Sequence, residues 1–144
     1  NWDEKLYRTY LETFNIDSSK RIKELSAGMK VKYQIAVALS HNAKLLILDE
    51  PTSGLDPVSR EELLTLFMYL AQTKKISILF STHITSDLEK CADTITYIKD
   101  GNLIASMEKM KFIKHFQYLK TSPTESDLSL EEIMIKNERC SYDF

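Results

Sequence analysis

Apolar positions along the chain recur first with the spacing of a helix and later with the spacing of strands. Over residues 1–15 the apolar side chains return every three or four residues, which places them on one helix face. These side chains are Leu6, Tyr7, Tyr10, Leu11 and Phe14. The pattern predicts an amphipathic helix whose apolar stripe packs into a core.

A second helical pattern follows a polar loop at residues 17–23. Ser26 is a residue type that caps helix N-termini, and apolar residues recur at helical spacing from there to residue 40. Gly28 has no Cβ, so a ligand can approach the backbone closely. The start of a helix offers N–H groups that suit a phosphate, although a capped helix alone is more often only structural.

An unbroken run of four aliphatic residues, Leu45–Leu48, ends in two adjacent acids, Asp49 and Glu50. A short continuous apolar run predicts a strand buried on both faces, as in parallel sheets. Ligands of open parallel sheets bind at the carboxyl ends of the strands, which is where these acids fall.

A helix and a second strand are predicted after this run. Asp56 is a suitable N-cap and Pro57 a suitable first residue for a helix that reaches about Lys74. Residues 76–82, ISILFST, are rich in residue types that favour strands. Strand, helix and strand form a βαβ unit, so we expect the two strands to be parallel.

Three side chains at this expected sheet edge have complementary chemistry. Asp49 and Glu50 point to opposite faces of a strand, so they are expected to do different jobs. One suits a hard cation such as Mg²⁺, and the other can orient or deprotonate a water molecule. His83 follows the second strand, and its position beside the acid-bearing strand favours a catalytic role over a purely structural one.

The rest of the chain predicts a hairpin and short helices. Asp100-Gly101 favours a tight type I′ turn between strands at residues 94–98 and 103–107. Residues 108–120 form a basic pattern with an apolar face, which predicts a surface helix, with membrane proximity as the alternative. Shorter segments are predicted as a helix at 87–92, a linker at 121–127, a helix at 129–136 and a disordered end at 137–144.

Composition agrees with an ordinary globular domain. The chain has 144 residues, of which 43% are hydrophobic and 28% charged. Its net charge of −2 gives no basic field for nucleic acid, and no apolar stretch is long enough to span a membrane. Cys91 and Cys140 have no CxxC spacing and suit free thiols in a reducing compartment.

Residues 45–57, LLILDEPTSGLDP, resemble the Walker B motif and D-loop of the ATP-binding cassette (ABC) ATPases. The resemblance extends from about Ile22 to Met107. It includes LSAGM, similar to the LSGGQ signature of the family, and STH, similar to the segment of its switch histidine. Ala27 replaces the first signature glycine and Met29 the glutamine, which puts the strength of the nucleotide contact there in doubt.

The resemblance implies a role for each residue of the sheet edge. Asp49 would hold Mg²⁺, Glu50 would polarise the attacking water, and His83 would contact the γ-phosphate of ATP. The cofactors implied are therefore ATP and Mg²⁺.

The resemblance also implies partners. Ser26 and Gly28 would close over the ATP of a second nucleotide-binding domain, in a homodimer or heterodimer, and Asp56 would face that domain across the interface. A transmembrane permease is expected as a further partner, nucleic acid is not, and the protein is expected in the cytoplasm at the inner face of the cell membrane.

The fold expected is α/β, a partial P-loop NTPase (ABC ATPase) fold with parallel strands, flanking helices and an antiparallel edge hairpin. No GxxxxGK[ST] phosphate loop and no initial Met occur in the sequence, so we expect a fragment, the C-terminal part of a nucleotide-binding domain. It is expected to divide into the end of a helical subdomain with the signature helix (1–42), a catalytic α/β core (43–107) and C-terminal helices with a tail (108–144).

The leading hypothesis from the sequence is an ATP-binding and ATP-hydrolysing subunit that powers an ABC-type membrane transporter. The isolated fragment, which lacks the phosphate loop, is expected to be inactive. Two alternatives stay open: a soluble ABC-family ATPase of translation or chromosome maintenance, and a non-catalytic degenerate partner subunit.

Overall fold

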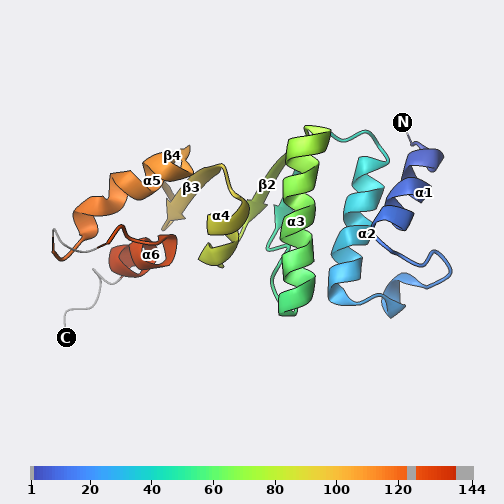
Figure 1. Cartoon of the computed structure of the whole chain (residues 1–144), viewed down its shortest axis with the longest axis horizontal. Coiled ribbons are helices and arrows are strands. Elements are labelled where there is room, and N and C mark those ends of the chain that lie inside the picture. Colours follow the sequence, from blue (N-terminus) through green and yellow to red (C-terminus); the bar gives the residue numbers. More distant parts are fainter. Residues whose placement is uncertain (1, 123–125, 139–144) are drawn as a thin grey trace. The chain divides into compact units, whose positions relative to one another are not determined.

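The computed structural model describes residues 2–122 and 126–138, and the chain divides into two compact units, Asn1–His83 and Ile84–Phe144 (Figure 1). The first unit contains α1 (Glu4–Thr13), η1 (Ile22–Glu24), α2 (Ala27–Leu39), β1 (Leu45–Asp49), α3 (Pro57–Lys74) and β2 (Ser77–Ser81). The second contains α4 (Thr85–Cys91), β3 (Thr94–Lys99), β4 (Asn102–Glu108), α5 (Lys109–His115), η2 (Phe116–Leu119) and α6 (Leu130–Glu138). Asn1, Cys140 and most of the end predicted as disordered lie outside the described residues.

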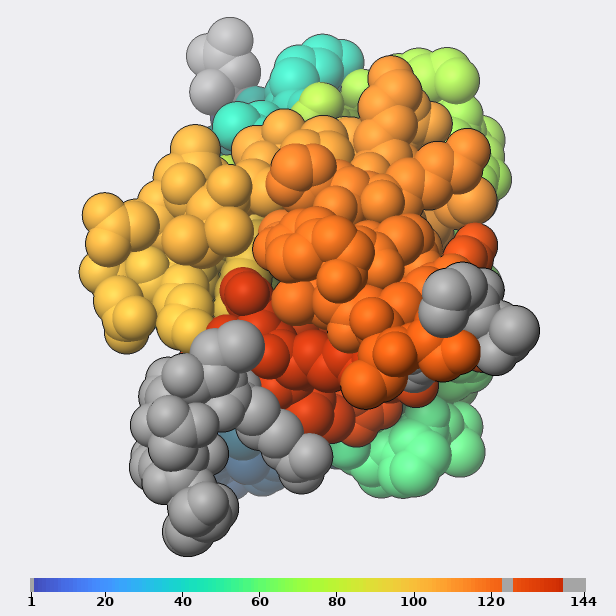
Figure 2. All heavy atoms as spheres, turned by 90° about the vertical axis from the view of Figure 1, so that its left-hand side faces the viewer, coloured from blue at the N-terminus to red at the C-terminus, as the bar shows by residue number. Residues whose placement is uncertain are grey.

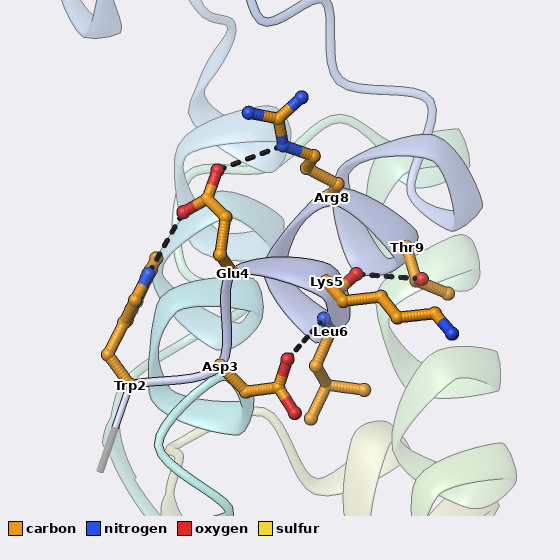
Figure 3. Close-up of polar contacts among 7 residues, drawn as sticks. All are labelled: Trp2, Asp3, Glu4, Lys5, Leu6, Arg8 and Thr9. Carbon is orange, nitrogen blue, oxygen red and sulfur yellow. Dashed lines mark hydrogen bonds and ion pairs between the residues drawn. The ribbon is translucent and has the colours of Figure 1, made fainter.

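The first helix is confirmed, with Asp3 as its N-cap (Figure 3). The Asp3 carboxylate accepts a hydrogen bond of 2.9 Å from the backbone N–H of Leu6, which satisfies one of the free donors of the first turn. The Glu4 carboxylate accepts from the Trp2 indole at 3.0 Å and from Arg8 at 2.9 Å. These contacts fix the start of α1 and hold the chain that enters it.

Three helices of the first unit lie side by side, α1 on α2 and α2 on α3 (Figure 1). The rings of Tyr7 in α1 and Tyr33 in α2 meet edge to face, with centroids 6.5 Å apart. Between α2 and α3 the Lys32 ammonium donates to the Glu62 carboxylate at 2.5 Å. The predicted stripe of α1 thus supplies core residues, of which Tyr10, Leu11 and Phe14 are buried.

Strands β1 and β2 form the parallel pair that the βαβ pattern predicts. Their register places Leu45 opposite Ser77 at one end and Asp49 opposite Ser81 at the other. One face of the pair packs on α3, where the rings of Phe67 and Phe80 lie 5.6 Å apart. The carboxyl ends of both strands therefore lie together at one edge of the first unit.

The prediction that the first strand is buried on both faces is wrong for this chain. Leu46 is buried, but Leu45 is 52% exposed, Ile47 is 71% exposed, and Leu79 opposite Ile47 is 57% exposed. These three side chains share the face away from α3, which lies open among the described residues. A continuous apolar run favours burial of both faces of a strand. It does not indicate which segment packs on the face away from α3.

The second unit contains the predicted hairpin, in which β3 and β4 are antiparallel. Asp100 and Gly101 have φ values of 50° and 74°, the left-handed conformation that a type I′ turn requires at both central residues. Lys99 and Asn102 pair across this turn, and a bulge follows Tyr97. The hairpin prediction is therefore confirmed in both its strands and its turn.

The inner face of the hairpin and the C-terminal helices share one core. Tyr97, Phe112 and Phe116 meet there with Ile133 of α6, and all four are buried. Figure 2 shows the α5–η2 segment (orange) and α6 (red) next to each other on one face of this unit. The helix predicted over residues 108–120 is divided into α5 and the 3₁₀ turn η2, and Phe116, the first residue of η2, is buried in this core.

Cys91, at the end of α4, is half-buried and has a free thiol that donates to the backbone carbonyl of Asp87 at 3.2 Å. Burial raises the pKa of this thiol to about 11, with the nearby Asp87 carboxylate as the next cause. This thiol therefore stays protonated and behaves as a small apolar side chain, as predicted. Within the described ranges, no helix is both long and apolar enough to cross a membrane.

Candidate active site

The carboxyl ends of β1 and β2 bring together Asp49, Glu50, Ser81 and His83. Asp49 is the last residue of β1 and Ser81 the last of β2, and they are paired in register. Glu50 and His83 each lie just beyond their strands. The three predicted residues of the sheet edge are therefore neighbours, as the parallel pairing requires.

Glu50 has a left-handed backbone, with φ at 46°. This conformation is costly for a residue with a Cβ, roughly 1–2 kcal/mol, and it persists where surrounding contacts enforce it. The Glu50 N–H donates to the Ser81 carbonyl at 3.2 Å and to the Ser81 hydroxyl at 3.1 Å. Glu50 is thus tied to β2 although it has left the regular strand.

The Glu50 carboxylate and the His83 imidazole lie in contact, with Oε2 and Nδ1 2.9 Å apart. The Glu50 side chain is 35% exposed, while that of His83 is 69% exposed, so the pair lies at the surface. Oε2 itself is buried, and no hydrogen bond of good geometry reaches it from the described residues. Because the Glu50 side chain as a whole is 35% exposed, its carboxylate can hold a water molecule for attack beside the imidazole.

Asp49 has a different partner, since its Oδ1 accepts a hydrogen bond of 2.5 Å from the Ser81 hydroxyl. The carboxylates of the two acids thus have different neighbours, His83 for Glu50 and Ser81 for Asp49. No three His, Cys, Asp or Glu side chains gather as a metal site in the described part of the chain. Mg²⁺ is commonly bound by one or two carboxylates together with water and substrate phosphates, so the exposed Asp49 fits such an ion.

The predicted signature residues lie in the first turn of α2. Ser26 is the N-cap, and its hydroxyl accepts from the backbone N–H of Met29 at 3.2 Å. Gly28 is buried against α3, where a Cβ at this position would lie 3.0 Å from the Cβ of Ser59. The missing Cβ of Gly28 therefore serves close packing between two helices of this chain, a structural reason that the sequence interpretation did not include.

Asp56 is the N-cap of α3, as predicted, and its Oδ1 accepts from the backbone N–H groups of Val58 and Ser59, both at 3.0 Å. Hydrogen bonds from the Ser59 side chain and backbone lower the pKa of Asp56 below its usual value of 3.8. The carboxylate is therefore ionised near neutral pH. Gly28 and Asp56 both lie beside Ser59, so the first turns of α2 and α3 form a second group of predicted residues.

Two serines in these groups were missed by the sequence interpretation. Ser81 was treated only as part of a strand, and its bonds to Asp49 and Glu50 depend on the register of β1 and β2. Ser59 was treated only as part of a helix, and its contact with Gly28 depends on how α2 packs on α3. The sequence signal that could have pointed to Ser81 is its position two residues before His83, a residue already predicted in the site.

Comparisons with known proteins point to nucleotide-binding subunits of transporters. A family model described as "AAA domain, putative AbiEii toxin, Type IV TA system" matches residues 3–86, more than half of the chain. The bacitracin transport ATP-binding protein BcrA of Bacillus licheniformis is 42% identical over 88 residues, covering 61% of this chain and 29% of that protein. The uncharacterized ABC transporter ATP-binding protein YcbN of Bacillus subtilis (strain 168) is 32% identical over 149 residues, covering 95% of this chain and 48% of that protein.

A solved structure resembles this chain as well. It is cbiO1 from Clostridium perfringens, described as part of the ABC transporter complex cbiONQ. The two share 28% sequence identity and a TM-score of 0.66, and the match covers 80% of this chain and 47% of that one. The chain thus spans less than half the length of each of the three relatives compared.

Proposed function

We propose that this chain, which belongs to the AAA domain family and is a relative of ABC transporter ATP-binding proteins, acts in ATP binding and hydrolysis as part of a subunit that powers a membrane transporter. The relatives named above are transport proteins or parts of transporters, which favours this function over the soluble ABC-family alternatives. The proposal concerns the full-length protein that carries this chain.

The contact of 2.9 Å between Glu50 and His83 carries the proposal. In the proposed reaction, Glu50 orients the attacking water and accepts its proton as the water oxygen bonds to the γ-phosphorus. The bond from the γ-phosphorus to the bridging oxygen breaks, and ADP leaves with that oxygen. The His83 ring donates a hydrogen bond to a γ-phosphate oxygen. Both groups must reach the same phosphate, and their side-by-side position beyond two parallel strands supports this.

Asp49 is the residue proposed to hold Mg²⁺, directly or through a water molecule. The Ser81 hydroxyl occupies one acceptor site of Oδ1 and leaves the remaining carboxylate lone pairs available. When bound, the ion would neutralise charge on the phosphate oxygens.

Ser26, Gly28 and Asp56 are proposed to act at an interface with a second nucleotide-binding domain. The N-terminus of α2 has the N–H groups and partial positive charge that suit a phosphate of the ATP bound by the partner. The Asp56 carboxylate is exposed at the start of α3, so it remains open to a partner while it caps its own helix.

The remaining sequence-based expectations are retained as proposals. The full-length protein would bind a permease at the cytoplasmic face of the membrane. The divisions 1–42, 43–107 and 108–144 would serve as helical, catalytic and C-terminal segments. The 144-residue chain on its own would show no ATP turnover with Mg²⁺, because it has no phosphate loop.

The test is the Glu50→Gln variant of the full-length protein. General-base assistance contributes a factor of about 10²–10⁴, so we expect ATP turnover to fall by that factor while ATP still binds. Glu12→Gln is the matched control, since it removes a charge from the exposed face of α1. Unchanged turnover of Glu50→Gln would contradict the proposed role.

A further inference from the structure

Ser81 has a hydroxyl that contacts both acids of the candidate active site. It donates to Oδ1 of Asp49 at 2.5 Å and accepts from the backbone N–H of Glu50 at 3.1 Å. The hydroxyl thereby uses its one donor on the last residue of β1 and one of its acceptor sites on the residue that follows it.

The strand register makes this arrangement specific to position 81. Ser81 is paired with Asp49, so the two side chains lie on the same face of the parallel pair. Ser77 lies on that face as well, but it is opposite Leu45 at the other end of the strands. A hydroxyl at the end of β2 reaches the acids, whereas the same group at its start does not.

The hydrogen bond between Ser81 and the Glu50 backbone helps to fix the position of the Glu50 carboxylate. The left-handed backbone of Glu50 turns its side chain out of the regular strand alternation, and its N–H is bound by both oxygen atoms of Ser81. His83, which contacts the Glu50 carboxylate, lies two residues further along the same segment. The segment 81–83 thus holds Glu50 at its backbone and at its side chain.

The bond to Asp49 bears on its side-chain orientation. A carboxylate on an exposed strand end rotates freely unless another group holds it, and the Ser81 hydroxyl holds Oδ1. Partners of this kind orient metal-binding groups in proteins, and their loss typically costs about 10–100-fold in metal affinity or activity.

We propose that Ser81 is a positioning residue that sets the Asp49 carboxylate for the divalent cation and the Glu50 backbone for the attacking water. This inference rests on the proposed function, because it assigns the orientation of the same two acids. It assigns no contact between Ser81 and substrate.

Ser81→Thr and Ser81→Val form the decisive pair of variants. Threonine and valine have nearly the same shape and both suit a strand, but only threonine keeps the hydroxyl. Ser77→Ala is the control for loss of a hydroxyl from the same face of β2. Thermal unfolding of each full-length variant checks that the fold is retained.

The first measurement is Mn²⁺ binding by electron paramagnetic resonance, with a non-hydrolysable ATP analogue bound to the full-length protein. We expect Ser81→Val to weaken Mn²⁺ binding about 10-fold or more. Ser81→Thr is expected to stay within about twofold of the wild type, as is Ser77→Ala, because both keep the hydroxyl at position 81. Affinity for the analogue without metal should be the same in all four proteins.

The second measurement is the Mg²⁺ dependence of ATP turnover. We expect Ser81→Val to need about 10-fold more Mg²⁺ for half-maximal turnover and Ser81→Thr to restore the wild-type value. Equal metal dependence of the threonine and valine variants would overturn the role of Ser81. It would leave the proposed function intact as long as Glu50→Gln still lost turnover. A wild-type protein that bound no Mn²⁺ with the analogue would overturn both.

Discussion

Glu50 and His83 lie 2.9 Å apart, carboxylate oxygen to ring nitrogen, because each follows one of two neighbouring parallel strands. The contact ties the end of β1 to the segment after β2 at the point where ligands of such sheets bind. A water molecule held by the carboxylate would therefore lie beside a hydrogen-bond donor for the phosphate that it attacks.

Gly28→Ala tests the packing of α2 on α3. The added Cβ would lie 3.0 Å from the Cβ of Ser59, and overpacking of this kind costs about 1–3 kcal/mol. Alanine is favoured over glycine in a helix by about 1 kcal/mol, which offsets part of that cost. We expect a net loss of up to about 2 kcal/mol in the free energy of unfolding, measured with urea.

The matched background for this test is Ser59→Gly, which removes the side chain that the new methyl group would meet. There the same Gly28→Ala change should stabilise the protein by up to about 1 kcal/mol, because only the helix propensity remains. An equal effect in both backgrounds would show that Ser59 is not what requires glycine at position 28.

Thr52→Val tests an unusual buried hydroxyl in the turn after Glu50. Thr52 is only 1% exposed, and within the described residues its Oγ1 has no hydrogen-bond partner. Burial of such a group costs about 1–3 kcal/mol, so valine, which has nearly the same shape, should raise the free energy of unfolding by about 1 kcal/mol. Thr52→Ser keeps the hydroxyl and loses the methyl group, so it should lower stability by about 1 kcal/mol. A destabilised valine variant would mean that the hydroxyl has a partner, such as a bound water.

Asp56→Asn tests the pH dependence of the α3 cap. Hydrogen bonds from Ser59 lower the pKa of Asp56 in the folded state, so its contribution to stability is fully present above the unfolded-state pKa, near 3.8. That contribution is lost as the pH falls through the lowered folded-state pKa. Asparagine caps a helix about as well but does not titrate. We therefore expect wild type and variant to differ in melting temperature most at neutral pH, and the difference to shrink as the pH falls below 3.8.

Other carboxylates contribute to acid denaturation with the same sign, since the pKa values of Glu4, Asp17 and Asp127 are also lowered by hydrogen bonds. Both proteins will therefore lose stability in acid, and only the difference between them reports on Asp56. A difference that stayed constant from pH 7 to pH 2.5 would contradict the assigned cause.

Local signals were sufficient for the features that depend on neighbouring residues in the sequence. Asp56 and Ser26 cap their helices, and Asp100-Gly101 forms the expected turn, because each of these depends on a few adjacent backbone groups. The meeting of Glu50 with His83 was also predictable, since parallel pairing aligns the ends of the two strands.

Features that depend on tertiary packing were not predictable in the same way. The bond from Ser81 to Asp49 requires one particular register, and a shift of one residue would place the hydroxyl on the other face. The exposure of Ile47 depends on which segment covers the sheet, and the apolar run contains no information on that. The packing of Gly28 against Ser59 was not predictable either, because the two residues are distant in sequence.

The most direct test of the account is a double-mutant cycle on ATP turnover in the full-length protein, with Glu50→Gln, His83→Ala and both changes together. If the two side chains act on one water and one phosphate, the double variant should be about as slow as the slower single variant, since groups that act as a unit give strongly non-additive losses. Both changes should leave ATP binding in place. Losses that simply multiply in the double variant would mean that Glu50 and His83 act independently and would contradict the site described here.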